Sequence, residues 1–127
     1  MGAEKTFKKD ERISLNKRIE ALFDSGTAIH SHPIKILWLP SEEPMKYPAQ
    51  VMFSVSSKRF KKAVDRNHIK RKLREAYRRQ KARLYEALKK QNNQWIICIL
   101  YTGNDPDPHI ETLADKLEQG FNLMIRP

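Results

Sequence analysis

Four basic residues recur at every fourth position near the middle of the chain, and their spacing points to a shared chemical role. If this stretch is helical, the four side chains lie one above the other along one face: Arg66, Lys70, Arg74 and Arg78. Like charges in such a row repel one another, whereas phosphate groups bound along the row would neutralise them. This basic row therefore indicates a surface that binds a polyanion.

The excess positive charge of the whole chain is confined to the segment that contains the basic row. The 127 residues carry a formal charge of +10. Residues 58–83 hold thirteen Lys or Arg against two acids, a net of +11, and the rest, with twelve basic and thirteen acidic side chains, carries −1. A basic coat that served only solubility would be spread more widely. Nucleic acid is the first candidate partner, with an anionic membrane surface or an acidic protein as alternatives.

Two neutral polar residues, Asn67 and His68, interrupt the cations. An amide can donate and accept hydrogen bonds, and an imidazole can hydrogen-bond or stack, so either residue could contact bases, sugar hydroxyls or a hydrated metal ion. The alternatives are a capping role for Asn67 near a helix start and an exposed surface position for His68. The residues alone leave both interpretations open.

Helical periodicity predicts three helices in the chain. The first helix is expected to have Ser14 as its N-cap, and the second is expected to begin at about Ala63. The third is expected to have Asp107 as its N-cap and Pro108 in its first helical position. Gly26 is expected to end the first helix in a left-handed conformation. The second helix would run to about Lys90, and a break near Gln80 is possible because that length is unusual.

Three further segments have the pattern of β-strands, namely residues 29–39, 50–56 and 95–101. The first two are expected to pair as a hairpin. The third is apolar on both pleat faces, which is typical of a central strand covered on both sides. The predicted order is α-β-β-α-β-α in a single domain of residues 13–127, preceded by a loose arm of residues 1–12.

The sequence predicts no hydrolytic site, which would need an activated nucleophile, a carboxylate pair in a cleft or a metal cage. Asp105, Asp107 and Glu111 are close together, but they flank two prolines at a helix start, where capping explains them. His30 and His32 have no further ligand beside them for zinc. We therefore predict no catalytic residue, no metal and no cofactor on the protein itself.

The single cysteine and the hydropathy of the chain indicate its compartment. Cys98 cannot form an internal disulfide and lies in the most apolar segment, so we predict a small core residue. That segment, 95–101, is far shorter than the roughly 20 apolar residues of a membrane span. The start of the chain does not resemble a secretory signal. We expect a soluble, cytoplasmic protein.

The basic segment resembles the signature helix of the bacterial ribonuclease P protein component. That family has an Arg-Asn-Arg core followed by Ile or Val, Lys and Arg, then Arg-Glu-Ala and an aromatic residue. This chain has Arg66-Asn67-His68-Ile69-Lys70-Arg71 and then Arg74-Glu75-Ala76-Tyr77. The preceding Phe53-Ser54-Val55-Ser56 with Lys58-Arg59, and Leu22-Phe23 with Gly26, also resemble the family, and the element order matches over residues 8–125.

The resemblance implies both a fold and a role. The fold is an α+β sandwich in which a central mixed sheet includes a left-handed β-α-β crossover, as in the second domain of ribosomal protein S5. The role is that of partner to ribonuclease P RNA, which removes the 5′ leader from precursor tRNA and uses Mg²⁺ for the hydrolysis. No obligate protein partner is implied.

The resemblance also implies two groups of site residues. Those expected to face the RNA subunit are Lys58, Arg59, Lys62, Arg66, Asn67, His68, Lys70, Arg71, Arg74 and Arg78. Those expected to line a cleft for the leader, between the first helix and the sheet, are Ile19, Phe23 and Phe53. The chain departs from the family pattern at His68, where a second arginine is usual, and at Ile19, where many members have an aromatic residue.

Two other kinds of protein would have a similar basic helix. A structural RNA-binding protein of the ribosomal type would bind folded RNA without any role in cleavage. A helix that binds a membrane or an acidic protein would need its bulky apolar stripe, which here is expected to pack in the core.

Overall fold

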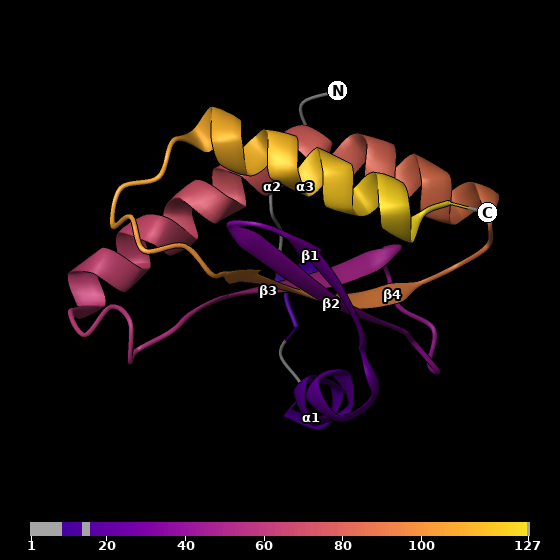
Figure 1. Cartoon of the computed structure of the whole chain (residues 1–127). Helices are drawn as coiled ribbons and strands as arrows, with labels where there is room; N and C mark the ends of the chain where they lie inside the picture. Colours follow the sequence, from indigo (N-terminus) through magenta and orange to yellow (C-terminus); the bar gives the residue numbers. More distant parts are fainter. Residues whose placement is uncertain (1–8, 14–15, 127) are drawn as a thin grey trace.

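The computed structural model describes residues 9–13 and 16–126, and it consists of a four-stranded sheet with two helices on one face and one on the other (Figure 1). In chain order the elements are the 3₁₀ turn η2 (Lys9–Glu11), α1 (Asn16–Ser25), β1 (Thr27–Ser31), β2 (Ile34–Pro40), β3 (Ala49–Val55), α2 (Ala63–Lys90), β4 (Trp95–Tyr101) and α3 (Ile110–Met124). The predicted α+β class is confirmed.

The strand order in the sheet is β1-β2-β4-β3, with β1 and β2 antiparallel, β2 and β4 antiparallel, and β3 and β4 parallel. The predicted hairpin between residues 29–39 and 50–56 is therefore wrong. Residues 27–40 form a hairpin by themselves, which turns at His32 and Pro33, because proline cannot donate to a strand ladder. The chain connects the parallel pair β3 and β4 through α2, as a parallel pair requires.

β4 is covered on both sides, as its sequence predicts. Ile97 and Ile99 face α2 and α3 in the larger core. Ile96 and Cys98 face the opposite side, where Leu22 of α1 packs on them. Burial raises the pKa of the Cys98 thiol to about 12, so the thiol stays protonated and unreactive at neutral pH. The sheet thus separates α1 from the basic segment on α2.

α2 is a single helix over its whole length, without the possible break near Gln80. Its buried stripe contains the predicted residues, including Ile69, Leu73 and Tyr77. Lys81 lies in the same stripe and is only 1% exposed. The helix ends at Lys90, before the QNN segment, where Asn92 has a φ of 56°.

Two of the predicted helix ends differ in the structure, and a third, Ser14, lies outside the described residues. α3 begins at Ile110 with His109 as its N-cap, so the prediction that Asp107 caps it is wrong. Gly26 does not adopt a left-handed conformation. Its N–H donates to the Leu22 carbonyl, and a Cβ on Gly26 would lie 2.3 Å from that oxygen. Glycine is needed at this position for close approach to α1.

The last residues of the predicted N-terminal arm pack against the sheet and α2, and residues 1–8 lie outside the described residues. Arg12 pairs with Val51 at the edge of β3. The Glu11 carboxylate is 1% exposed and lies 3.0 Å from Nζ of Lys81. Glu11 and Arg12 therefore contact the sheet and α2. Among the described helices, none combines the length and the hydropathy of a membrane span.

Candidate nucleic-acid interface

α2 exposes two flanks that differ in how their cations are paired. One flank faces α3, and we call it the α3 flank. The other carries the basic row and lies on the side of β3, where Arg12 pairs with the strand. The buried stripe of α2 lies between the two flanks on the side of the sheet, and Arg71 and His68 connect them on the outward side of the helix.

Acidic or amide groups from α3 and from the loop before it pair with the cations of the α3 flank. Lys72 Nζ donates to the Asp107 carboxylate and, at 2.8 Å, to the Pro108 carbonyl. Arg79 lies 3.7 Å from the Glu111 carboxylate, and Arg83 donates to the Asn122 side chain over 2.5 Å. This flank is therefore largely neutralised within the protein.

The row flank keeps more of its charge. Lys70 and Arg74 have no acidic side chain within ion-pair distance among the described residues. Arg78 pairs with Glu75, one turn before it. Burial, followed by the charges of Arg12 and Arg78, lowers the pKa of Arg74 from its ordinary value. The folded protein thus brings like charges together on this flank.

The basic loop before α2, residues 56–62, is fixed by two of the arginines that were expected to face RNA. Arg59 donates to the Thr102 carbonyl in the loop between β4 and α3. Arg66 Nη1 donates to the Phe60 and Lys61 carbonyls, both over 2.8 Å. Since these bonds use only part of each guanidinium, both arginines can also reach a ligand.

The bonds of Arg59 and Arg66 set the shape of the loop, and its lysines remain exposed. Lys58 and Lys62 extend from this loop into solvent. The backbone N–H groups of residues 58 and 59 donate to Ser56 Oγ, at 3.2 and 3.3 Å, which tightens the turn. The loop therefore presents three exposed lysines, Lys61 being the third, next to the start of α2.

His68 lies between two charged groups. Its Nε2 is 2.7 Å from Oδ1 of Asp107, and its Nδ1 is 3.4 Å from Nη2 of Arg71. A neutral imidazole satisfies both contacts if Nδ1 accepts from Arg71 and Nε2 donates to Asp107. The hydrogen bonds from Lys72 and His68 lower the pKa of the Asp107 carboxyl to about 2. Asp107 therefore binds side chains of α2 and does not cap α3.

Asn67 is exposed in the second turn of α2, past the helix start at Ala63, so the capping alternative for this residue does not apply. A shallow groove runs along this part of the helix surface, lined by Val64, Asp65, Asn67, His68, Lys70, Arg71 and Arg74. Six of the predicted RNA-facing residues, counting Arg66 beside this groove, thus lie within three turns of the helix, and the basic loop precedes them.

The three residues predicted to line the leader cleft do not share a face of the sheet. Phe53 points toward α2, where its ring packs edge-on against Tyr77 with the ring centroids 5.9 Å apart. Ile19 and Phe23 belong to α1, on the opposite face (Figure 1). Phe23 is 52% exposed, so its ring is available to a ligand.

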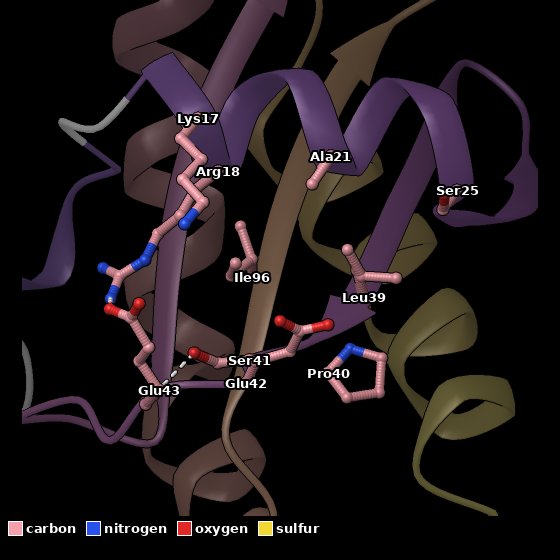
Figure 2. A pocket seen from close by; sticks show the side chains of 10 residues that line it. All are labelled: Lys17, Arg18, Ala21, Ser25, Leu39, Pro40, Ser41, Glu42, Glu43 and Ile96. Carbon is pink, nitrogen blue, oxygen red and sulfur yellow. Dashed lines mark hydrogen bonds and ion pairs between the residues drawn. The ribbon is translucent and has the colours of Figure 1, made fainter.

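A pocket lies on the other side of α1 from Phe23. Figure 2 shows Lys17, Arg18, Ala21 and Ser25 of α1 above a floor of Leu39, Pro40 and Ile96, with Ser41, Glu42 and Glu43 at the rim. Lys17, Ala21 and Ser25 recur every four residues, as do Ile19 and Phe23, and Leu22 contacts the sheet between these two rows. The residues that line the pocket include two cations, Lys17 and Arg18, and two acids, Glu42 and Glu43. The pocket therefore has no excess positive charge that would favour an anion.

Sequence reasoning missed three residues that shape the interface, namely Arg12, Lys72 and Asp107. Lys72 belongs to the basic run, but only the position of α3 reveals that it is paired. Arg12 falls in a segment without periodicity, so no sequence pattern places it beside α2. The part of the chain that the structure describes holds no cluster of three or more His, Cys, Asp or Glu side chains suited to a metal.

Comparison with known proteins identifies the family of this fold and basic face. The family model described as Ribonuclease P matches residues 7–123. The chain belongs to the ribonuclease P protein family. The ribonuclease P protein component of Porphyromonas gingivalis W83 is 35% identical over 114 residues, which cover 89% of this chain and 82% of that protein. The component of Chlorobaculum tepidum is 40% identical over 115 residues, 84% of this chain and 75% of that protein.

Solved structures of ribonuclease P proteins share the fold. The protein of Staphylococcus aureus superposes with a TM-score of 0.66 at 20% identity, covering 91% of this chain and 96% of that one. The Thermotoga maritima protein gives 0.67 at 22% identity, covering 86% and 93%. The resemblance seen in the sequence is thereby confirmed. Membership in the ribonuclease P family implies a role in tRNA 5′ processing, as the protein part of a bacterial endoribonuclease complex.

Proposed function

We propose that this chain binds ribonuclease P RNA through the basic loop and the row flank of α2, and that it binds the 5′ leader of precursor tRNA beside α1. The observation that carries the proposal is the unequal pairing of the two flanks of α2. Acids of the protein neutralise the α3 flank, whereas Lys70 and Arg74 on the row flank have no such partner among the described residues. Unpaired cations in a row match the phosphates of an RNA backbone.

Hydrolysis is then the task of the RNA subunit, which uses Mg²⁺. The protein supplies positive charge, so it lowers the repulsion between RNA phosphates and reduces the Mg²⁺ concentration that the complex needs. Arg59 and Arg66 keep the basic loop in place, and Lys58, Lys62, Asn67 and Arg71 contact backbone or base groups. His68 supports Arg71 through their hydrogen bond.

Lys70 and Lys72 provide a matched test of the RNA-binding face, because they lie two residues apart on the same helix and differ in pairing. Lys70→Gln should lower the salt dependence of ribonuclease P RNA binding by about 0.7–0.9 in log-log slope, the contribution of one phosphate contact. Lys72→Gln should leave the slope nearly unchanged, since Lys72 already binds Asp107. Equal effects of the two substitutions on the slope would refute the assignment of the row flank.

Phe23 is the platform that we propose for a base of the single-stranded leader, because its ring is half exposed on α1. Phe23→Ala should weaken the binding of precursor tRNA to the complex by about 1–3 kcal/mol and leave mature tRNA unaffected. Phe53→Ala serves as the control, since the Phe53 ring packs on Tyr77 in the core. It should lower stability and change both affinities alike. An equal loss for both tRNAs in Phe23→Ala would exclude a leader site there.

A further inference from the structure

An exposed apolar side chain lies in the first turn of α2, within the basic face. Val64 is 73% exposed, against 52% for Phe23 and 49% for Leu123, the other large hydrophobic residues that are exposed in the described part of the chain. A β-branched residue at an exposed helix position has a lower helix propensity than alanine, and its apolar surface stays in water. Contact with a partner would bury the surface of Val64 that folding leaves exposed.

Since single exposed hydrophobic residues are common on protein surfaces, the surroundings of Val64 determine its role. Asn67, His68 and Arg71 follow it after three, four and seven residues, the spacing that places side chains on one face of a helix. This face lies opposite the buried stripe, and its four residues, which we call the outward strip, line the groove described above. An apolar, an amide and an imidazole side chain thus precede the first guanidinium of the strip.

The two polar residues next to Val64 differ in how the protein uses them. The side chain of Asn67 is exposed and makes no hydrogen bond to another described residue, so its amide can donate and accept. The ring of His68 is held at both nitrogens, by Asp107 at 2.7 Å and by Arg71 at 3.4 Å, and the side chain is still 36% exposed. The strip therefore combines an available amide with a ring in a fixed orientation.

The cations beside the strip indicate what covers it. Lys70 lines the same groove, and Lys58 and Lys62 lie in the loop that precedes the helix. An RNA whose phosphates contact these lysines would bring its riboses and bases over the strip. In an A-form helix the bases are stacked and only their edges are accessible, whereas an unpaired base exposes a flat apolar face together with a hydrogen-bonding edge. Val64 and Asn67 match that combination.

We propose that the outward strip binds one unpaired nucleobase of ribonuclease P RNA, with Val64 against the face of the base and Asn67 at its hydrogen-bonding edge. His68 forms a wall of this site. The site rests on the proposed function, since it needs the RNA to be bound by the row flank and the basic loop. Phosphate contacts attract any RNA, so the base contact is what distinguishes ribonuclease P RNA from other folded RNAs.

Val64→Ala and Asn67→Ala test the site in full-length protein. Both positions are exposed, and alanine has a higher helix propensity than valine or asparagine, so the thermal midpoint should not fall. Each variant should bind ribonuclease P RNA about fivefold to tenfold more weakly at roughly 0.1 M salt, because an apolar contact or a hydrogen bond is lost. Affinity for an unrelated folded RNA of equal length should not change. The log-log salt slope should also be unchanged, since no phosphate contact is removed.

Leu123→Ala and Lys70→Gln are the matched controls. Leu123 is an exposed apolar residue near the end of α3, so its replacement should alter neither affinity. Lys70→Gln should instead lower the salt slope for both RNAs. The base site is refuted if Val64→Ala or Asn67→Ala binds ribonuclease P RNA like the wild type, or loses the unrelated RNA to the same extent. If the wild type does not bind ribonuclease P RNA at all, the proposed function is wrong.

A cross-linker at position 64 tests whether the contact is an unpaired base. Val64→Cys introduces an exposed thiol, and the native Cys98 is buried, so a thiol-reactive benzophenone labels position 64 in the folded protein. After irradiation of the complex, primer extension should map the cross-link to one short unpaired segment of ribonuclease P RNA. Cross-links that fall in base-paired helices would overturn the site, even if Val64→Ala weakens binding.

Discussion

At residue 68 a histidine stands where an arginine is usual in the family motif, and its environment accounts for the replacement. The imidazole connects Arg71 to Asp107, so it takes part in a chain of hydrogen bonds from a guanidinium to a carboxylate. An arginine at this position would bring a second guanidinium beside Arg71. The motif alone does not reveal this contact, because Asp107 lies outside the motif, 39 residues after His68.

Asp107 is the only acid that contacts His68 among the described residues, and its removal should strengthen RNA binding. Asp107→Asn frees Lys72 and His68 and raises the net charge of the face by one, so we expect a severalfold higher affinity for ribonuclease P RNA and a steeper salt dependence. Asp115→Asn, at an exposed position of α3, is the control for charge alone. Weaker RNA binding in Asp107→Asn would mean that the carboxylate positions His68 for contact.

The pKa of Asp107 gives a test of the same contacts by pH. Its pKa of about 2 lies below the ordinary value of about 3.9, so the ion pairs contribute fully above pH 4 and are lost as pH falls through about 2. Carboxyl NMR titration should give a midpoint near 2 in the wild type. Lys72→Gln should move the midpoint toward 3.9, because Lys72 is the largest cause of the shift. A midpoint near 3.9 in both proteins would show that the contacts are absent in solution.

Cys98 should be unreactive in the folded protein. Its pKa of about 12 is above the ordinary thiol value of about 8.5, so the folded state favours the protonated form. Because the folded protein holds this proton more tightly than the unfolded chain does, the thiol's contribution to the free energy of unfolding is fully present below about pH 8.5. It is lost progressively as pH rises toward 12. Alkylation by iodoacetamide at pH 8 should occur only at the rate of unfolding, and urea should accelerate it. Rapid alkylation of the native protein would contradict a buried thiol.

At the scale of elements, periodicity in the sequence predicts α2 and α3 and the central strand well. Their apolar residues repeat over many positions, so one misplaced residue does not change the interpretation. The pairing of strands was predicted wrongly, because residues 29–39 read as one strand although proline at position 33 turns the chain. The order β1-β2-β4-β3 depends on contacts between residues more than 40 positions apart, which local patterns do not encode.

For the candidate site, the sequence predicted which residues of α2 are exposed, but it did not predict the side of the sheet that Phe53 faces or the partner of Lys81. The residues of α2 that face outward follow from the helical period, which places Lys70, Arg71 and Arg74 correctly on the surface. Phe53 was grouped with Phe23, but alternation along β3 puts its ring on the other face of the sheet. Lys81 interrupts the apolar stripe of α2 without an obvious reason, since its partner Glu11 is 70 residues away.

The ion pair between Glu11 and Lys81 connects η2 to α2, and it should be important for stability. Glu11→Gln leaves the buried ammonium of Lys81 without its counter-charge, so we expect a loss of about 3–5 kcal/mol in the free energy of unfolding. Urea unfolding at neutral pH measures the loss. Glu86→Gln is the control, because the Glu86–Lys90 pair is exposed and should contribute less than about 1 kcal/mol. Similar losses in the two variants would contradict a buried pair.

At the scale of the whole molecule, the distribution of charge favours one orientation of the protein in the proposed complex with RNA. The exposed surface of α3 carries Asp115 and Glu118, which repel phosphates, and Glu111, which pairs with Arg79. The basic loop and the row flank attract phosphates. In the proposed complex the row flank of α2 contacts the RNA, and α3, which covers the same face of the sheet, lies on the other side of α2 (Figure 1). α1 and Phe23 lie on the opposite face of the sheet from α2, so leader and RNA subunit can be bound at the same time (Figure 1).

The most direct test of this account is cleavage of precursor tRNA in a reconstituted complex. The purified chain is mixed with the cognate ribonuclease P RNA and a 5′-labelled precursor tRNA at low Mg²⁺ concentration. We predict that the wild type enhances cleavage at the mature 5′ end, and that the double variant Lys70→Gln with Arg74→Gln needs more Mg²⁺ for the same rate. If the folded wild-type protein binds the RNA but leaves cleavage unchanged, the chain is a structural RNA-binding protein and the central claim is wrong.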